Sequence, residues 1–153
     1  MLHTKMRFKF IQKKDPEYTK ERMLRWEVLS KPQGMPPESV YTPEEEASLH
    51  FVAIEGKSVV GCVLFYPETP EGGRVHQMAI SEEYRGKGFG RQLLTTLEHE
   101  LVKRGVKEVH LFARQDTLGF YEQMGYHLRG NPLEIGGISQ QLMQKNLEDA
   151  HER

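Results

Sequence analysis

Polar and apolar residues alternate along several short runs of the chain, as they do in strands with one buried face. The first run places three side chains on one face: Met6, Phe8 and Phe10. Runs rich in β-branched and aromatic residues follow at 49–56, 57–67, 72–80 and 106–113. A last β region extends from about 126 to 145, and we expect it to be interrupted at 130–137. The link at 55–57 is short enough for a hairpin, so the strands between 49 and 80 are predicted to form an antiparallel meander.

Apolar residues spaced three and four apart predict helices between the strands. The longest helix runs from about 88 to 103 and carries a stripe of Leu94, Leu97 and Leu101. Two others are predicted at 16–30 and 116–125, with Asp15 and Asp116 as their N-caps. The order is therefore strand, helix, three strands, helix, strand, helix, strand. This order predicts an α/β or α+β fold with a mixed, mostly antiparallel central sheet flanked by helices.

The chain of 153 residues has the size of one ordinary domain. It contains no repeat or linker, so we predict a single domain at 1–146 and a solvated tail at 147–153. Its 21 Lys and Arg residues balance 22 Asp and Glu. No overall field therefore attracts nucleic acid or an anionic membrane, and we expect neither as a partner. The one cysteine, Cys62, allows no internal disulfide and favours a reducing compartment, the cytoplasm.

A cluster of glycine and basic residues lies between a predicted strand and the 88–103 helix, in the string "RGKGFGR". Free N–H groups at a helix start, together with the helix dipole, form a site for a phosphate group. The glycines let a ligand approach the main chain closely, and the basic side chains add charge. The candidate site comprises Arg85, Gly86, Lys87, Gly88, Phe89, Gly90 and Arg91.

Three nucleotide-binding patterns and one plain structural explanation compete for this cluster. No Walker A string occurs, so a P-loop is excluded. The cluster has the spacing G-x-G-x-G after a meander, whereas a Rossmann fingerprint needs G-x-G-x-x-G within a βαβ unit, so that match is weak. Glycines alone also form turns that start a helix without binding any ligand.

The third pattern is the pyrophosphate loop Q/R-x-x-G-x-G/A of the Gcn5-related N-acetyltransferase (GNAT) superfamily, which "RGKGFG" fits at every position. The stretch "QMAISEEYRGKGFGRQLL" resembles the strand, loop and helix of that superfamily, and "LFARQDTLGFYEQMGYH" resembles its later Phe-Tyr helix. The resemblance covers about residues 50–145. More narrowly, "LRWEVLSKPQG" and "LEIGGISQQLMQK" are similar to the small bacterial acetyltransferases of the ElaA-like branch, except that Ser139 and Gln140 replace a usual proline and histidine.

The resemblance implies the acyl-CoA N-acyltransferase fold and acetyl-CoA as cosubstrate, with no metal. The pyrophosphate would lie on the amides of residues 86–91, and the pantetheine would run beside the strand that ends in Met78, Ala79 and Ile80. Backbone groups of Met78 and Ile80 would pair with the pantetheine. The Met78 amide would face the thioester carbonyl, where negative charge develops during acyl transfer.

Two side chains are implied as catalytic. Tyr121, in "GFYEQMG", matches the tyrosine that many members use as general acid for the departing thiolate, although the same position also suits an aromatic of an amphipathic helix. His76, two residues before Met78, matches a histidine that some members direct toward the acceptor amine, although strand histidines are often only hydrogen-bonded wall residues. Arg74 stands where other members have a glutamate base, and we expect it and Gln140 to bind the acceptor.

These features predict an enzyme that transfers acetyl directly to a primary amine of a small molecule or peptide. A ping-pong route through Cys62 is disfavoured, because Cys62 lies a strand away from the loop. The competing class is a non-catalytic acyl-CoA sensor or regulatory module of the same fold. The sequence does not identify the acceptor. The acidic run at 44–46 is typical of a solvated face, although in this fold it can line the acceptor entrance, and the edge of the last strand offers a route to a homodimer.

Overall fold

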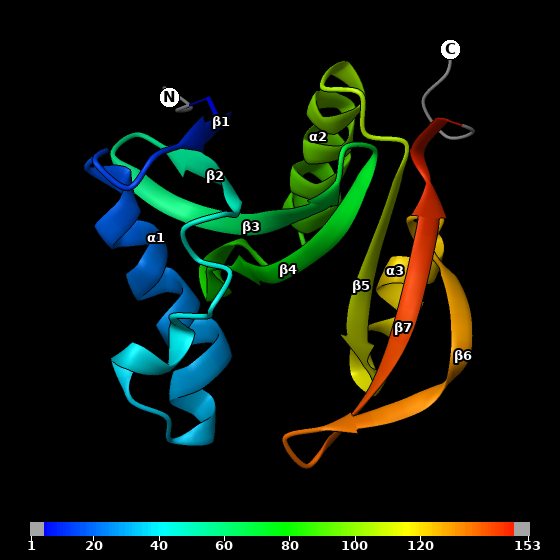
Figure 1. Ribbon diagram of the computed structural model, residues 1–153. Coiled ribbons are helices and arrows are strands. Elements are labelled where there is room, and N and C mark those ends of the chain that lie inside the picture. The colour runs from blue at the N-terminus through cyan, green and yellow to red at the C-terminus, as the bar shows by residue number, and fades with distance from the viewer. Residues whose placement is uncertain (1–4, 149–153) are drawn as a thin grey trace.

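The computed structural model describes residues 5–148, which form one seven-stranded sheet with helices on both faces (Figure 1). The strands are β1 (Arg7–Ile11), β2 (Leu49–Glu55), β3 (Ser58–Thr69), β4 (Gly72–Ile80), β5 (Glu108–Arg114), β6 (His127–Ile135) and β7 (Ile138–Asn146). The α-helices are α1 (Glu17–Arg25), α2 (Phe89–Lys103) and α3 (Leu118–Gln123). A π-helical turn spans Trp26–Ser30, and 3-10 turns span Lys31–Gln33, Pro37–Val40, Glu82–Tyr84 and Gln115–Thr117. Within 5–148, every helix is too short or too polar to cross a membrane.

The strands follow the spatial order β1-β2-β3-β4-β5-β7-β6 and pair antiparallel everywhere except between β4 and β5. The predicted meander and the mixed, mostly antiparallel sheet are confirmed. The parallel pair is short, because only Gly72–Arg74 of β4 lie against Glu108–His110 of β5. Beyond these residues the two strands diverge and split the sheet into two halves (Figure 1).

The helices cover the two faces of the sheet separately. Helix α2 buries Leu93, Leu94, Leu97 and Leu101 in the main core, where they join side chains of β2, β3, β5 and β7. Helix α1, on the opposite face, buries Tyr18 and Leu24 in a second cluster with Val52, Ile54 and Cys62. The alternation predicted for these strands is therefore used on both faces, and the lone cysteine is a buried core residue.

Both predicted helix caps are wrong. The Asp15 carboxylate accepts a hydrogen bond from the Gln12 amide at 2.7 Å, and Pro16 occupies the N-cap position of α1. Asp116 lies inside the 3-10 turn that precedes α3, so Thr117 occupies that cap. In each case a tight turn just before the helix takes the position that a capping side chain would need.

The C-terminal part also differs from prediction. Strand β6 runs through the predicted interruption with a register irregularity between Arg129 and Leu133, and the chain turns only at Gly136-Gly137. An edge strand tolerates the proline in this run, because one of its sides needs no ladder bonds. The last strand, β7, pairs with β5 and β6, so the edge at the C-terminal end of the sheet is β6 and not β7. Leu147, assigned to the solvated tail, is buried in the core, and residues 149–153 lie outside the described part.

Candidate active site

The glycine-rich turn forms the start of α2. Gly86 and Gly88 have φ values of 73° and 84°, in the left-handed region that glycine adopts without strain, and Gly88 is the N-cap of the helix. The first helical bond runs from the Gln92 amide to the Gly88 carbonyl, so the amides before Gln92 have no helical acceptor. The turn and the neighbouring Phe120 line a cavity of about 280 Å³. An anion placed there would meet free N–H groups and the positive end of the helix dipole.

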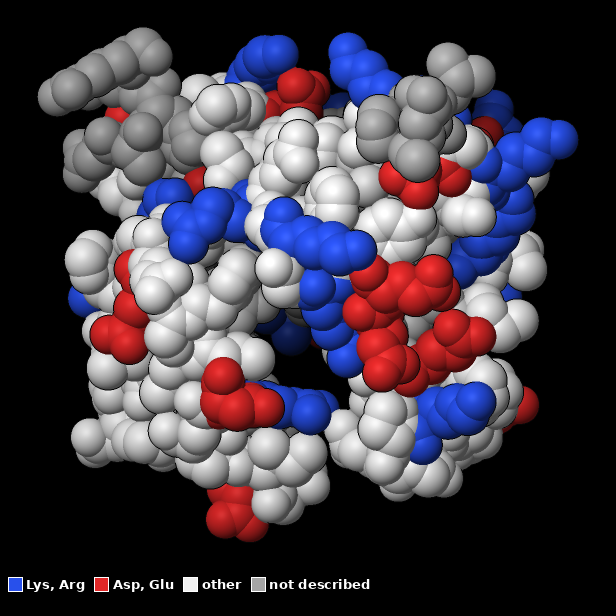
Figure 2. Space-filling model, turned by 180° about the vertical axis from the view of Figure 1, so that it is seen from behind, with Lys and Arg blue, Asp and Glu red and all other residues white. Residues whose placement is uncertain are grey.

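Basic side chains surround this turn in different ways. The Arg85 guanidinium donates to the Ile80 carbonyl at 3.1 Å, and Arg91 donates to the Gln123 side chain at 3.2 Å. Lys87 is exposed, and the Phe89 ring packs edge-on against Tyr84. On the face of the molecule seen from behind, both basic and acidic side chains lie at the margin of a central hollow (Figure 2). The predicted phosphate-binding residues thus form one continuous turn beside β4.

Strand β4 is interrupted by a β-bulge that the sequence did not reveal. His76 pairs with Leu64 and Ala79 pairs with Cys62, so Gln77 and Met78 together lie opposite a single residue of β3. Gln77 has a φ of 51° and is the one non-glycine residue within 5–148 with positive φ. Its side-chain amide donates to the Val40 carbonyl at 2.9 Å, which holds this strained conformation.

The bulge changes what each predicted β4 residue can offer. Met78 has no register partner in β3, and β5 has already diverged beside it, so this part of β4 has no neighbouring strand on its β5 side. The Ala79 side chain points away, into the α1 core cluster, so only its backbone is available for a ligand. Because a glutamine carries no turn signature, the sequence pattern gave no signal for the bulge.

The diverging strands enclose a large cavity, of about 800 Å³. It brings together residues from distant parts of the sequence: His76, Met78, Arg85, Tyr121 and Gln140. The 3-10 turns after α1 form its opposite wall. Arg74, in contrast, does not line this cavity, because its guanidinium forms an ion pair with Glu44. Two candidate catalytic residues and one of the two candidate acceptor residues thus share one chamber.

Tyr121 points from α3 toward β4. Its hydroxyl donates to the Met78 sulfur at 3.7 Å, and its ring packs edge-on against Tyr126. Burial raises the pKa of Tyr121 to about 12, so the hydroxyl keeps its proton at neutral pH. A buried, protonated phenol beside Met78 has the chemical form that a general acid requires.

His76 lines the same chamber from β4, two residues before Met78. Burial, followed by the charge of Arg74, lowers the pKa of His76 to about 4, so the imidazole is neutral at pH 7 and presents a lone pair. Its Nε2 lies 3.0 Å from the Ser48 hydroxyl oxygen. Ser48 comes from the segment before β2 and was not predicted as a site residue. No motif marks it, since the two residues are 28 positions apart.

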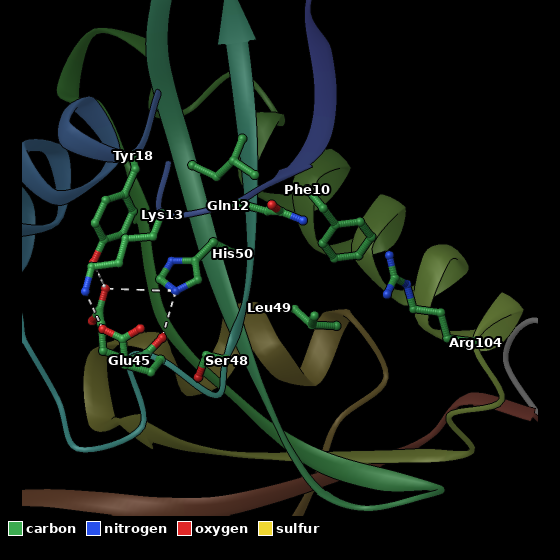
Figure 3. Close-up of a pocket in the computed structure, with 11 residues that line it drawn as sticks. Phe10, Gln12, Lys13, Tyr18, Glu45, Ser48, Leu49, His50 and Arg104 are labelled. Carbon is green, nitrogen blue, oxygen red and sulfur yellow. Dashed lines mark hydrogen bonds and ion pairs between the residues drawn. The ribbon is translucent and has the colours of Figure 1, made fainter. Parts of the chain in front are cut away.

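The acidic run at 44–46 is not a uniformly solvated face. Glu45 is buried and accepts hydrogen bonds from Arg25 and from the Tyr18 hydroxyl, whereas Glu46 is exposed. Glu45 and His50 line a second cavity, of about 280 Å³ (Figure 3). The prediction of a solvated run is therefore wrong at Glu45, because a buried arginine on α1 compensates its charge.

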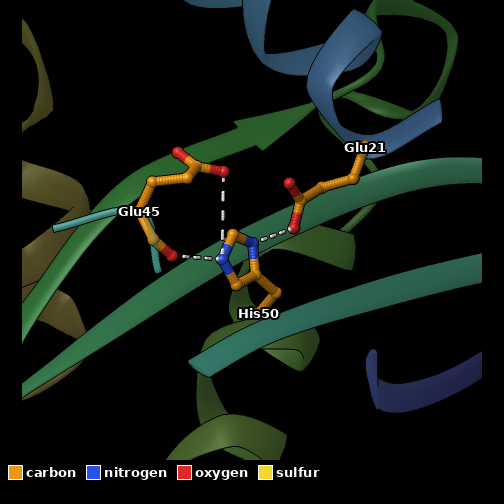
Figure 4. Close-up of side chains that lie close together, drawn as sticks. All are labelled: Glu21, Glu45 and His50. Carbon is orange, nitrogen blue, oxygen red and sulfur yellow. Dashed lines mark hydrogen bonds and ion pairs between the residues drawn. The ribbon is translucent and has the colours of Figure 1, made fainter. Parts of the chain in front are cut away.

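The same network contains three groups that could ligate a metal. Single ligand atoms of Glu21, Glu45 and His50 lie within 4.8 Å of one another (Figure 4). However, the Arg25 guanidinium lies 3.2 Å from Glu21 and 2.7 Å from Glu45, so it already supplies a positive charge to both carboxylates. The cluster is a buried charge network and does not fit a further cation.

The fold and the chamber agree with a known protein class. Residues 16–126 match the acetyltransferase (GNAT) family, so the chain belongs to this family of acetyl-CoA-dependent N-acetyltransferases. The resemblance inferred from the sequence motifs is confirmed. Over 75 residues, the chain is 39% identical to L-ornithine N5-acetyltransferase NATA1 of Arabidopsis thaliana. This match covers 44% of the chain and 33% of the plant enzyme, so the chain spans about a third of that relative.

Solved structures share the same architecture. Escherichia coli ElaA superposes with a TM-score of 0.79 at 17% identity, over 93% of this chain and 100% of that chain. A GNAT family acetyltransferase from Elizabethkingia anophelis with acetyl-CoA bound superposes with a TM-score of 0.70 at 14% identity, over 92% of this chain and 97% of that chain. At these identities the likeness shows the fold, which is the one predicted.

Proposed function

We propose that this protein transfers the acetyl group of acetyl-CoA directly to a primary amine of a small molecule or peptide. One observation carries the proposal: Tyr121 and His76 face the same chamber beside Met78, at the point where β4 leaves β5. An acyl transferase needs a proton donor, a proton acceptor and free backbone groups around one carbon atom. These three requirements meet in this chamber.

The donor would enter along the unpaired part of β4. Its pyrophosphate would bind the amides of residues 86–91, with charge supplied by Lys87. Its pantetheine would lie between the diverging strands β4 and β5 and would pair with backbone groups of Met78 and Ile80. The fit is favourable because β4 pairs with β5 only over Gly72–Arg74, which leaves the later part of β4 without a strand on that side.

The chemistry would use two proton transfers. The amine attacks the thioester carbon, and its surplus proton passes to the lone pair of His76. The Met78 amide donates a hydrogen bond to the carbonyl oxygen as it becomes an oxyanion. The C–S bond then breaks, and the Tyr121 hydroxyl gives its proton to the departing thiolate. Because the pKa of Tyr121 is raised to about 12, its phenolate recovers a proton readily from solvent.

The acceptor would approach from the wall formed by the 3-10 turns after α1, near Gln140. The Arabidopsis relative is named for L-ornithine, so diamino acids are the first acceptors to test. Arg74 forms an ion pair with Glu44 outside the chamber, so Gln140 is the residue that we propose for acceptor binding. We retain the cytoplasm as the proposed location and a homodimer through β6 as the proposed assembly.

Ligand-dependent melting tests the donor site first. A ligand that binds only the folded protein raises the melting temperature, so acetyl-CoA and CoA should stabilise the protein, whereas ATP and NAD should not. An amine screen with thiol release as the signal then tests transfer. Tyr121→Phe should lose turnover and retain CoA affinity. Stabilisation by CoA without release of thiol from any amine would support a sensor and contradict the enzyme.

A further inference from the structure

Ser48 contacts the candidate base from outside the reaction chamber. Its hydroxyl oxygen lies 3.0 Å from Nε2 of His76, which lines the large cavity. Ser48 itself lines the smaller cavity, next to Glu45 and His50 (Figure 3). We therefore infer that Nε2, which contacts Ser48, faces away from the place where an acceptor amine would lie. This leaves Nδ1 as the ring nitrogen available to that amine.

The position of Ser48 is fixed from several sides. Its amide donates to the Glu44 carbonyl at 3.0 Å, and its side chain is buried. Glu45, three residues before Ser48, accepts two hydrogen bonds from Arg25, at 2.7 and 3.0 Å, and one from Tyr18 at 2.7 Å. These bonds fix the backbone around Ser48 and so keep its hydroxyl oxygen beside the His76 imidazole.

The smaller cavity leaves room for the serine proton to point away from His76. Exposed Lys13 and Glu46 also line it, so it communicates with solvent. The serine proton can point into this cavity, and the hydroxyl oxygen is then free to accept a hydrogen bond from the imidazole. The opposite arrangement would direct the serine proton at Nε2 and leave Nδ1 protonated, with no lone pair toward the chamber.

We propose that Ser48 is the positioning residue of His76: its hydroxyl oxygen accepts the Nε2–H hydrogen bond and thereby keeps the Nδ1 lone pair directed toward the acceptor amine. The role of His76 as a base rests on the proposed function, whereas the tautomer of its imidazole does not. The charged groups around the ring are Arg74 on β4, Arg25 on α1, and Glu44 and Glu45 before β2. These charges act on the protonation of the ring as a whole, whereas the hydrogen bond to Ser48 acts on Nε2 alone.

NMR of the imidazole nitrogens tests the tautomer without any substrate. With ¹⁵N-histidine, the wild type should show a protonated Nε2 and an unprotonated Nδ1 for His76, assigned with His76→Gln. Ser48→Ala should shift the ring toward a mixture of tautomers, and Ser48→Thr, which keeps the hydroxyl, should retain the wild-type signals. Melting curves establish that the variants are folded. A protonated Nδ1 in the wild type, or unchanged ring signals in Ser48→Ala, would overturn the proposal.

Kinetics separate positioning from a structural role. Ser48→Ala should lower kcat by about ten- to a hundredfold, which is part of the hundred- to ten-thousandfold that a general base supplies, and should leave the KM for acetyl-CoA unchanged. Ser48→Thr should restore most of kcat. Ser58→Ala, at an exposed position at the start of β3, is the control for serine removal and should be neutral.

The outcomes distinguish a failure of the proposed function from a failure of the positioning role of Ser48. No thiol release by the wild type would reject the proposed function while the tautomer result stands on its own. Full activity of both His76→Gln and Ser48→Ala, in a wild type that is active, would show that the contact is structural and would overturn the positioning role. A loss of kcat in both variants, with the change of tautomer in Ser48→Ala, would support it.

Discussion

Replacing Arg25 by methionine should destabilise the fold strongly. The Arg25 side chain is fully buried and forms an ion pair with Glu21 at 3.2 Å and with Glu45 at 2.7 Å. Methionine leaves two carboxylates buried, with His50 beside Glu21 and the Tyr18 hydroxyl beside Glu45. Removing one partner of a buried pair costs about 3–5 kcal/mol of the free energy of unfolding. For a domain of this size, the melting temperature should fall by about 6–20 °C.

The pH dependence of this loss identifies its cause. A buried carboxylate without its cation binds a proton more tightly in the folded than in the unfolded chain, so the Arg25→Met variant should gain stability as the pH falls from 7.5 toward 5. The difference from the wild type should therefore shrink. Urea unfolding at several pH values measures both free energies.

Two comparison proteins complete the test. Arg25→Met/Glu45→Gln removes both charges of the closest pair, so it should cost less than the two single changes added together. Lys103→Met breaks an exposed pair with Glu100, where Lys103 is 72% exposed, and should cost less than about 1 kcal/mol. A loss below about 1 kcal/mol for Arg25→Met, or one independent of pH, would refute the reasoning.

Three further predictions follow from the site. Gly88→Ala and Gly105→Ala, at φ values of 84° and 88° with no atom within 4 Å of the new Cβ, should each cost about 1–2 kcal/mol, but calorimetry should find weaker CoA binding only for Gly88→Ala. Equal CoA affinity would exclude the turn as the pyrophosphate site. Tyr121→Phe should lower kcat by about a hundredfold or more with little change in the KM for acetyl-CoA, and unchanged kcat would remove it as the acid. Burial lowers the pKa of His50, but the hydrogen bond and charge of Glu21, with those of Glu45, outweigh this and raise it above 6.5. The stability it contributes is present below pH 6.5 and lost as the pH rises through the raised pKa, so His50→Gln should flatten the stability profile there, and an unchanged profile would contradict the assignment.

Much of the fold was predictable, because its signals are local. Alternation within single strands and the leucine stripe of α2 depend on neighbours a few residues away, and both elements form where the pattern predicts. The glycine-rich turn is equally local, since a left-handed backbone at Gly86 and Gly88 requires residues without Cβ. The two N-cap predictions were wrong because a turn just before a helix can move the expected capping side chain out of the N-cap position. The local composition does not show whether such a turn forms.

The sequence by itself therefore determined most of the elements, the glycine-rich turn and the family, whose motifs are continuous in the chain. Only the tertiary structure decided where β4 bulges and which distant side chains contact one another around the site. The bulge at Gln77 depends on register with β3, and the contacts of Ser48 with His76 and of Glu44 with Arg74 join residues 28 and 30 positions apart. Such contacts depend on how strands and loops pack across the sheet, and packing is decided by the whole core rather than by any local pattern.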